Sequence, residues 1–179
     1  AEVDQDLIDE LLAHCPLDLL ADEYAHRREH TVEFQTLFLR LLLPHARIVP
    51  LLCSFGAEDL DPVGPAVQAM VEALRAALAC YPRRVCLLAS VDLAHIGPRY
   101  GDSFRPHAGT SKHHQDADRH LLEIAATGDA AAFAALLAGE GNARRICGLS
   151  PIYTMLAALG GRTRGELLDY GLTKVDTYD

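Results

Sequence analysis

The sequence predicts one α/β domain over residues 1–179, with a mostly parallel central sheet flanked by helices. Segments with helical spacing of apolar residues alternate with short apolar runs that suit buried strands. Between Arg47 and Ala89 the order is strand, helix, strand, which predicts a βαβ unit with parallel strands and a right-handed crossover. Half of the 179 residues are hydrophobic and 23% are charged, so the chain is long and apolar enough to bury a core.

The first two helices are predicted from capping residues and apolar spacing. Asp4 is a suitable N-cap for a helix whose leucines recur at helical spacing up to Pro16. A second helix is expected from Thr31 to Leu43, where Pro44 stops it. Its late half is very apolar, so we expect that end to be buried.

Strands and helices alternate in the rest of the chain. An apolar run over 47–55 predicts a strand, and Pro50 places it at a sheet edge or delays its start. A helix is expected from Pro65 to about Ala79, followed by a buried strand over 85–89. Further elements are expected as follows: a helix ending at Thr127, a helix from Ala130 to Leu137, a helix from about Pro151, and a final strand within 165–178.

The stretch 87–102 brings an acid and a histidine directly after an apolar strand. Ser90, Asp92 and His95 follow the apolar run, and Gly97 begins a Gly-Pro pair that ends any regular element. In open α/β sheets ligands bind at the carboxyl ends of strands, so this is the layout of an active site. A tight turn would let the Asp92 carboxylate orient the His95 imidazole. A turn-capping aspartate and a surface histidine fit the spacing equally well.

Polar residues also crowd the start of the second predicted helix. Glu29, His30 and Glu33 stand there, and His30 and Glu33 share a helical face because they are three residues apart. Capping by Thr31, with acidic residues near a helix N-terminus, accounts for both carboxylates. It does not account for His30, which is therefore a candidate functional residue.

Cys147 lies just before the helix expected from Pro151 and beside Arg144 and Arg145. A cysteine at a helix N-terminus next to arginines is expected to have a lowered pKa and thiolate character. This suits a nucleophile or a soft metal ligand, and a buried structural cysteine is an equal alternative. Four histidines of a charged segment that includes Asp118 are expected to be solvated or to line a cleft rim: His107, His113, His114 and His120.

Composition excludes several kinds of partner. A net charge of −9 argues against duplex nucleic acid, because phosphate binding needs a basic patch. No apolar run approaches membrane-spanning length, and no signal peptide is recognisable. The five cysteines show no CxxC or disulfide framework, which favours a reducing cytoplasm, and those other than Cys147 are expected in the core. Because no P-loop, GxGxxG or GxSxG motif occurs, no nucleotide cofactor is expected.

Three motifs, in this order, resemble the Memo-like family, whose members are similar in fold to the class III extradiol dioxygenases. Residues 29–39 resemble the family's Glu-His-Ser-x-Glu-x-Gln-x-Pro-Phe-Leu pattern, with Thr31 for the serine and Leu37 for the proline. Residues 89–97 resemble Ser-Ser-Asp-x-x-His-x-Gly, with a valine at the second serine. Residues 147–152 match Cys-Gly-x-x-Pro-Ile.

The resemblance implies a metal-dependent, dioxygenase-like redox enzyme of unknown substrate. The roles it implies are Cys147 as ligand of one iron, copper or zinc ion, His95, Asp92 and His30 in catalysis, and Glu29, Glu33 and Ser90 in substrate binding. Family members carry an earlier segment with two further metal-binding histidines, for which this chain shows no counterpart. The chain is therefore expected to correspond to the C-terminal two-thirds of a Memo-like domain, incomplete at its N-terminus.

Two other functions remain open. The same cleft would suit a non-catalytic module that binds a peptide or a small anionic ligand. A thiol hydrolase would need Cys147 and His95 within hydrogen-bond reach of each other. An incomplete domain would also expose a sheet edge or an apolar face, so we expect homo-oligomers or low stability.

Overall fold

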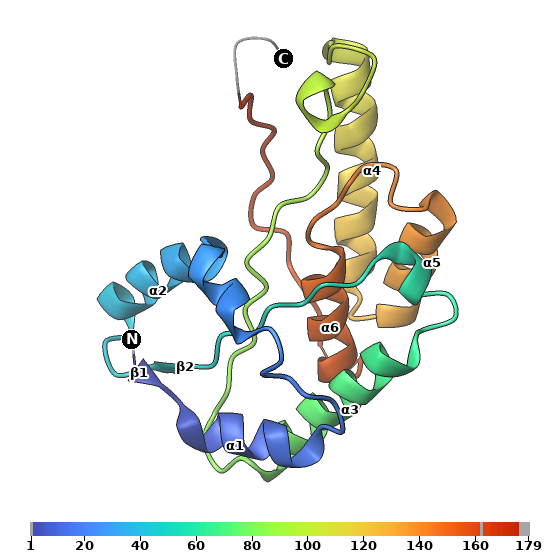
Figure 1. The fold of residues 1–179 in the computed structure, drawn as a ribbon. Helices are drawn as coiled ribbons and strands as arrows, with labels where there is room; N and C mark the ends of the chain where they lie inside the picture. The colour runs from blue at the N-terminus through green and yellow to red at the C-terminus, as the bar shows by residue number, and fades with distance from the viewer. Residues whose placement is uncertain (1, 162, 176–179) are drawn as a thin grey trace.

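Helices dominate the fold, and the described sheet is one pair of short parallel strands. The computed structural model describes residues 2–161 and 163–175. Its α-helices are α1 (Gln5–His14), α2 (Thr31–Leu42), α3 (Pro65–Cys80), α4 (Ala108–Ala126), α5 (Ala130–Glu140) and α6 (Leu149–Leu159). Short 3₁₀ helices cover Glu23–Arg28, Ala57–Asp59 and Pro98–Tyr100. The strands β1 (Glu2–Val3) and β2 (Arg47–Ile48) pair in parallel, which makes the fold α/β (Figure 1).

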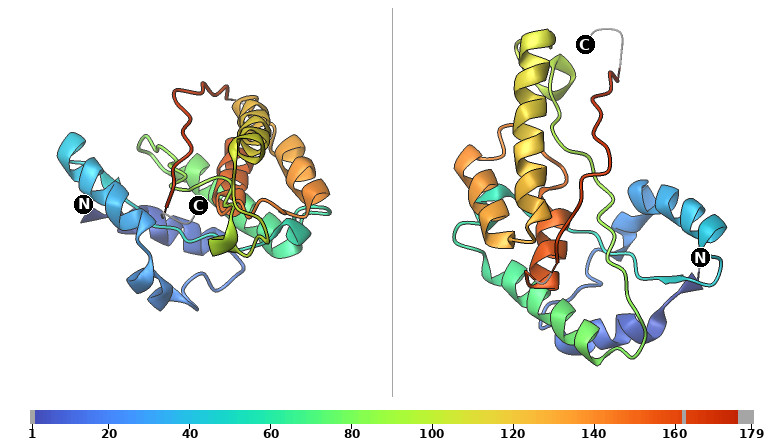
Figure 2. Two further views of the ribbon diagram at one scale, coloured as in Figure 1. Left: turned by 90° about the horizontal axis from the view of Figure 1, so that it is seen from above. Right: turned by 180° about the vertical axis from the view of Figure 1, so that it is seen from behind.

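Helix α1 packs against α3 and forms the smaller of two apolar clusters. Asp4 caps α1 as expected, because its carboxylate accepts the N–H of Leu7 at 3.3 Å. The two views of Figure 2 agree with Figure 1 in showing α1 against the C-terminal half of α3. The buried residues of this cluster are Leu7, Leu11, Ala73, Leu74, Ala77, Tyr81 and Ala158.

The larger apolar cluster lies where α4, α5 and α6 meet α3. Leu121, Phe133 and Leu137 are completely buried there. The predicted break between α4 and α5 is confirmed: Gly128 has a φ of 78°, which glycine adopts without strain, and Asp129 caps α5. Helix α5 continues to Glu140, three residues beyond the predicted end, and Gly141 closes it.

The expected βαβ unit is wrong. The strand predicted over 47–55 is limited to Arg47–Ile48, and its partner is β1 rather than the run over 85–89. That run has no strand assignment; it passes between the part of the molecule with α1 and α2 and the part with α4 to α6 (Figures 1 and 2). A strand exists only where a neighbour satisfies its backbone groups, and apolar composition cannot supply that neighbour. Residues 165–175 also form no strand, and 176–178 lie outside the described residues.

Helix α2 is more exposed than its composition predicts. None of its residues is buried, so the expected burial of its late half is wrong. Two cysteines expected in the core, Cys80 and Cys86, are exposed as well, while Cys15 and Cys53 are half-buried. None of the described helices has the length and apolarity needed to cross a membrane.

Candidate functional site

Asp92, His95 and Cys147 converge on one point of the structure. A carboxylate oxygen of Asp92, a ring nitrogen of His95 and the Sγ of Cys147 all lie within 4.8 Å of one another. The His95 Nε2 is 3.8 Å from Asp92 Oδ2. Two of the three sequence motifs therefore meet, and their residues offer oxygen, nitrogen and sulfur donors to one position.

Backbone hydrogen bonds hold the two motifs side by side. The N–H of Gly148 donates to the carbonyl of Asp92 at 3.1 Å, and the N–H of His95 donates to the carbonyl of Arg144 at 2.9 Å. A side chain at position 148 would collide with this arrangement, because a Cβ there would lie 2.9 Å from the Asp92 carbonyl oxygen and 2.8 Å from Val91. The glycine that follows Cys147 thus permits the close approach of the Asp92 segment.

The His95 ring is fixed in orientation. Its Nδ1 lies 3.0 Å from the carbonyl oxygen of Arg145, and a carbonyl can only accept, so Nδ1 carries the proton. The neutral ring consequently keeps its free lone pair on Nε2, the nitrogen that faces Asp92. Tyr100 packs edge-on against the ring, with 4.8 Å between the ring centroids, and only 23% of the His95 side chain is exposed.

Arg145 and Asp102 brace the loop that carries His95. Arg145 has a φ of 52°, its Nη1 donates to the His95 carbonyl at 3.1 Å, and its Nη2 donates to Asp102 at 2.6 Å. The other oxygen of Asp102 accepts the N–H of Gly97 at 2.8 Å. The hydrogen bond from Arg145, followed by that from Gly97, lowers the pKa of the Asp102 carboxyl group.

The expected lowering of the Cys147 pKa is wrong. Loss of surrounding water raises the pKa of this thiol and outweighs the hydrogen bond from the Asp92 N–H, which lowers it. The Asp92 carboxylate adds a smaller rise. The thiol and the Asp92 backbone exchange hydrogen bonds of 3.3 and 3.4 Å. Cys147 precedes Gly148, the N-cap of α6. The guanidinium groups of Arg144 and Arg145 form ion pairs with Asp118 and Asp102. The Cys147 thiol is hydrogen-bonded to the Asp92 backbone rather than to His95, which argues against a thiol hydrolase.

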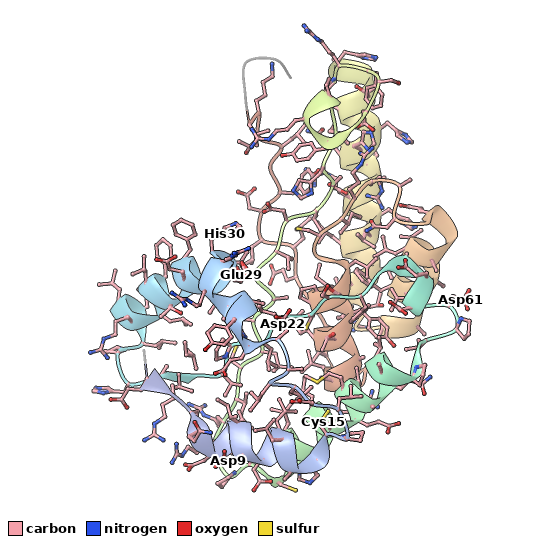
Figure 3. All side chains as sticks on the ribbon, viewed as in Figure 1. Asp9, Cys15, Asp22, Glu29, His30 and Asp61 are labelled. Atoms are coloured by element: carbon pink, nitrogen blue, oxygen red, sulfur yellow. The ribbon has the colours of Figure 1, made fainter. Side chains whose placement is uncertain are left out.

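The first motif touches the second through Ser90. The Ser90 hydroxyl donates to the carbonyl of Thr31 at 3.3 Å. Glu29 caps the start of α2, because its carboxylate accepts the N–H groups of Thr31 and His30, each at 2.7 Å. These hydrogen bonds, that of Thr31 first, lower the pKa of Glu29. The His30 ring is 75% exposed, and Figure 3 shows it with Glu29 at the end of α2 nearest the extended segment after α3. Glu33 is exposed on the next turn.

One buried charge network near the site escaped prediction. Asp118, expected in a solvated segment, is 2% exposed; it pairs with Arg144, which is also buried, and accepts the Tyr170 hydroxyl at 2.9 Å. Burial and the bond to Asp118 raise the pKa of Tyr170 to about 12. The signal was available in the sequence: Asp118 stands three residues before the buried Leu121 and so lies on the core face of α4.

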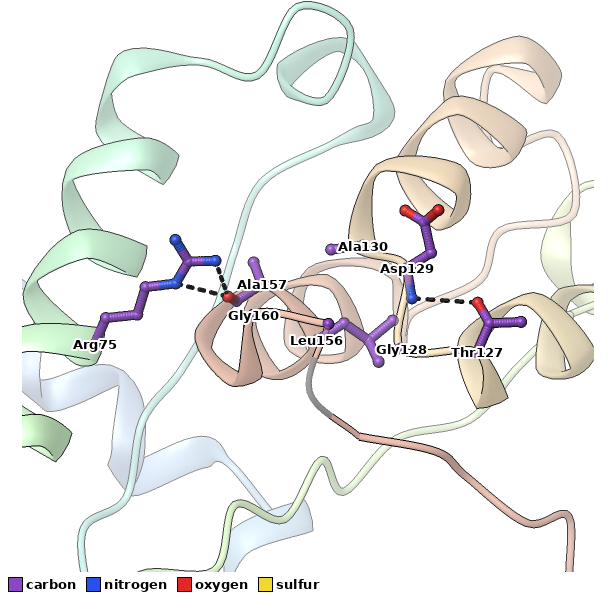
Figure 4. A pocket seen from close by; sticks show the side chains of 9 residues that line it. Arg75, Thr127, Gly128, Asp129, Ala130, Leu156, Ala157 and Gly160 are labelled. Carbon is purple, nitrogen blue, oxygen red and sulfur yellow. Dashed lines mark hydrogen bonds between the residues drawn. The ribbon is translucent and has the colours of Figure 1, made fainter.

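A pocket at the C-terminal end of α6 lies away from this cluster. It encloses about 470 Å³ between α3, the α4–α5 turn and the C-terminal end of α6 (Figure 4). Arg75, which lines this pocket, donates both Nε and Nη2 to the carbonyl of Ala157. The pocket lies at the C-terminal end of α6, whereas Cys147 precedes the N-terminal end of the same helix. A helix of this length separates its two ends by about 15 Å. The described residues that line this pocket include none from the three sequence motifs.

Comparisons with known proteins agree with the motif resemblance. The family model described as Memo-like protein matches residues 1–178. A MEMO1 family protein of Aquifex aeolicus is 30% identical over 172 residues, which are 94% of this chain and 42% of the relative. A MEMO1 family protein of Thermus thermophilus is 32% identical over 158 residues, which are 88% of this chain and 43% of the relative. No solved structure gives a significant match.

The chain spans less than half the length of these curated relatives. The family match, which runs over nearly all of the chain, lends no support to the expectation that the chain is the last two-thirds of the family's domain.

Proposed function

The chain belongs to the Memo-like protein family, and from this premise we propose that it is a metal-dependent redox protein with a dioxygenase-like activity. The observation that carries the proposal is the convergence of Asp92, His95 and Cys147 within 4.8 Å. The relatives are named only by family, so the activity rests on the chemistry of these three side chains. A fold related to the class III extradiol dioxygenases is part of the same proposal.

The three donors fit one iron, copper or zinc ion. Thiolate, imidazole and carboxylate together suit a transition metal better than magnesium or calcium, which prefer oxygen ligands alone. Three protein ligands leave a coordination position open, which a catalytic centre needs and a closed structural zinc site lacks. When bound, a redox-active iron or copper ion would supply the one-electron chemistry that reactions with dioxygen require.

His95 is positioned for two tasks at this centre. Its lone pair on Nε2 can bind the ion, because the Arg145 carbonyl holds the proton on Nδ1. Without an ion, the same nitrogen can take a proton from a bound substrate, and the Asp92 carboxylate at 3.8 Å would stabilise the charged ring. The raised pKa keeps Cys147 protonated at rest, so metal binding would release its proton.

We assign the first motif to the substrate side of the centre. The exposed His30 is proposed as a further acid/base group, and Glu33, exposed on the next turn, as a contact for the ligand. Glu29 would act mainly by fixing the start of α2, since its oxygens already accept backbone N–H groups. Ser90 would hold this helix start beside the Asp92 segment through its bond to Thr31.

Elemental analysis tests the proposal directly. Protein purified without chelators should contain iron, copper or zinc, and the Cys147→Ala variant should contain one equivalent less. The matched control is Cys86→Ala, because Cys86 is also an exposed cysteine but lies outside the cluster. Equal metal content in all three proteins would overturn the metal centre. Ligand binding that survives metal removal would then favour the module that binds a peptide or small anion.

A further inference from the structure

A second group of metal-ligating side chains lies where the C-terminal ends of α1 and α3 meet. A carboxylate oxygen of Glu10, a ring nitrogen of His14 and the Sγ of Cys80 all lie within 4.8 Å of one another. Glu10 and His14 are four residues apart on α1, and Cys80 is the last residue of α3. None of the three belongs to the motifs of the candidate site, and the proposed function does not use them.

The packing of α1 on α3 brings these side chains together. Leu7 and Leu11 face the core from α1, and His14 continues the same stripe one turn later. On α3, Ala77 is completely buried and Cys80 follows it by three residues. The group therefore sits where the apolar contact between the two helices ends and solvent begins, with His14 and Cys80 exposed and Glu10 half-exposed.

The His14 ring is oriented as a metal-binding histidine usually is. Its Nδ1 lies 2.8 Å from the Glu10 carbonyl oxygen, which can only accept, so Nδ1 carries the proton and Nε2 keeps the lone pair. A backbone carbonyl that holds the other ring nitrogen is the common support of a histidine ligand. The Glu10 carboxylate Oε2 lies 3.9 Å from this same Nδ1, so the carboxylate has to swing toward Nε2 when an ion binds.

The local field favours a cation. His14 ends α1 and Cys80 ends α3, so two helix C-termini, each with a partial negative charge, point to this place. Glu10 and a deprotonated Cys80 would together match the charge of a divalent ion. Sulfur, nitrogen and oxygen donors select zinc over magnesium or calcium.

We propose that Glu10, His14 and Cys80 bind one zinc ion that ties the end of α1 to the end of α3. Ligand atoms around a tetrahedral zinc ion lie about 3.3–3.8 Å apart, so the exposed side chains need to move by roughly 1 Å. A solvent molecule would complete the coordination. The zinc would stabilise the α1–α3 contact rather than take part in the chemistry at Cys147.

Cobalt titration separates this site from the one at Cys147. In the 179-residue chain carrying Cys147→Ser, Co²⁺ should produce a thiolate-to-cobalt charge-transfer band that saturates at one equivalent and disappears when Zn²⁺ is added. Adding Cys80→Ser should abolish the band, whereas adding Cys86→Ser, which removes an exposed cysteine outside the group, should leave it intact. Zinc should also raise the Tm of the Cys147→Ser protein but not of its Cys80→Ser derivative.

The variants His14→Ala and Glu10→Gln decide whether loss of the band in the Cys80→Ser variant comes from a lost ligand or from a folding defect. Both retain every thiol and should weaken cobalt binding at least about tenfold. A band of equal strength with and without Cys80, or no band at all in the Cys147→Ser protein, would overturn this site. Since Cys147 is absent throughout, failure here leaves the metal centre of the proposed function untouched.

Discussion

The carboxylate of Asp102 determines where the His95 loop lies. One of its oxygens accepts from Gly97 and the other from Arg145, and Arg145 also donates to the His95 carbonyl. Asp102 is thus connected directly to the Gly97 N–H and, through Arg145, to the His95 carbonyl. Because the carboxylate is only 14% exposed while the guanidinium is 40% exposed, solvent screens part of the ion pair.

Asp102→Asn should lower the free energy of unfolding by about 1 kcal/mol at pH 7, because it removes the charged acceptor of a partly exposed pair. The effect should depend on pH. Folding lowers the pKa of Asp102, so its contribution is complete above the ordinary aspartate value of about 4 and is lost as the pH falls through the lower folded value. Urea denaturation of both proteins at pH 7 and about pH 3 measures this.

The matched control is Asp116→Asn, which removes an exposed acid paired with Lys112 and should change stability little. If the difference between wild type and Asp102→Asn were as large at about pH 3 as at pH 7, the ionised carboxylate would not be the stabilising group.

Single residues also show where sequence reasoning stops. The spacing of Asp92 and His95 predicted their proximity, and the structure brings them together with Cys147. The direction of the Cys147 pKa was not predictable, because its main cause is the loss of water around the thiol, which depends on how distant segments pack against it. The two arginines, expected to act on the thiol, instead pair with Asp118 and Asp102, which are distant in sequence, and Arg144 also pairs with Glu140 four residues before it.

At the level of elements, helices were more predictable than strands because their signals are local. Asp4, Asp129 and Pro65 each mark a helix start by a contact or constraint within a few residues. The runs over 47–55 and 85–89 have strand composition, yet strand formation depends on a partner segment far away in sequence. The parallel partner of β2 is β1, only two residues long, which no periodicity could reveal.

The cap of α1 also joins distant elements. Asp4 accepts the Leu7 N–H and, through its second oxygen, the Tyr81 hydroxyl at 2.6 Å, just past the end of α3. The hydrogen bond from Tyr81 is the main cause of the lowered pKa of Asp4, a residue that is only 7% exposed. This acid therefore stabilises both the helix start and the α1–α3 contact.

Asp4→Ala should lower the free energy of unfolding by about 2 kcal/mol, as it removes a helix cap and leaves a buried hydroxyl without its acceptor. Thermal or urea unfolding followed by circular dichroism measures the change. Asp6→Ala, an exposed acid in the first turn of the same helix, is the control and should cost less than half as much. Equal losses for both variants would mean that Asp4 stabilises α1 through the helix dipole and not as its N-cap.

Over the whole molecule, apolar surface is distributed unevenly. Two buried clusters hold α1, α3, α4, α5 and α6, whereas α2 carries a continuous apolar face outside both. Its exposed side chains are Phe34, Leu37, Phe38, Leu41 and Leu42, followed by Leu43, each between 57% and 77% exposed. A contiguous exposed apolar patch of this kind marks a place where another surface binds.

This face should make the chain associate with itself. Light scattering after gel filtration should give a mass above that of one chain, rising with protein concentration, because pairing two α2 faces removes apolar surface from water. Leu37 and Leu41 are 63% and 77% exposed and stand four residues apart on one face, so the double variant Leu37→Glu/Leu41→Glu should lower the mass to that of a single chain.

Leu168→Glu is the control for that experiment, since Leu168 is 88% exposed but lies outside α2. It should leave the association unchanged. A wild-type chain that keeps the mass of one copy at every concentration would show that the α2 face does not pair with itself.

Because the carbonyl of Thr31, at the start of this helix, accepts the Ser90 hydroxyl, a partner on α2 would also cover the approach to the candidate site. Loss of association should therefore be accompanied by greater exposure of His30 to chemical modification.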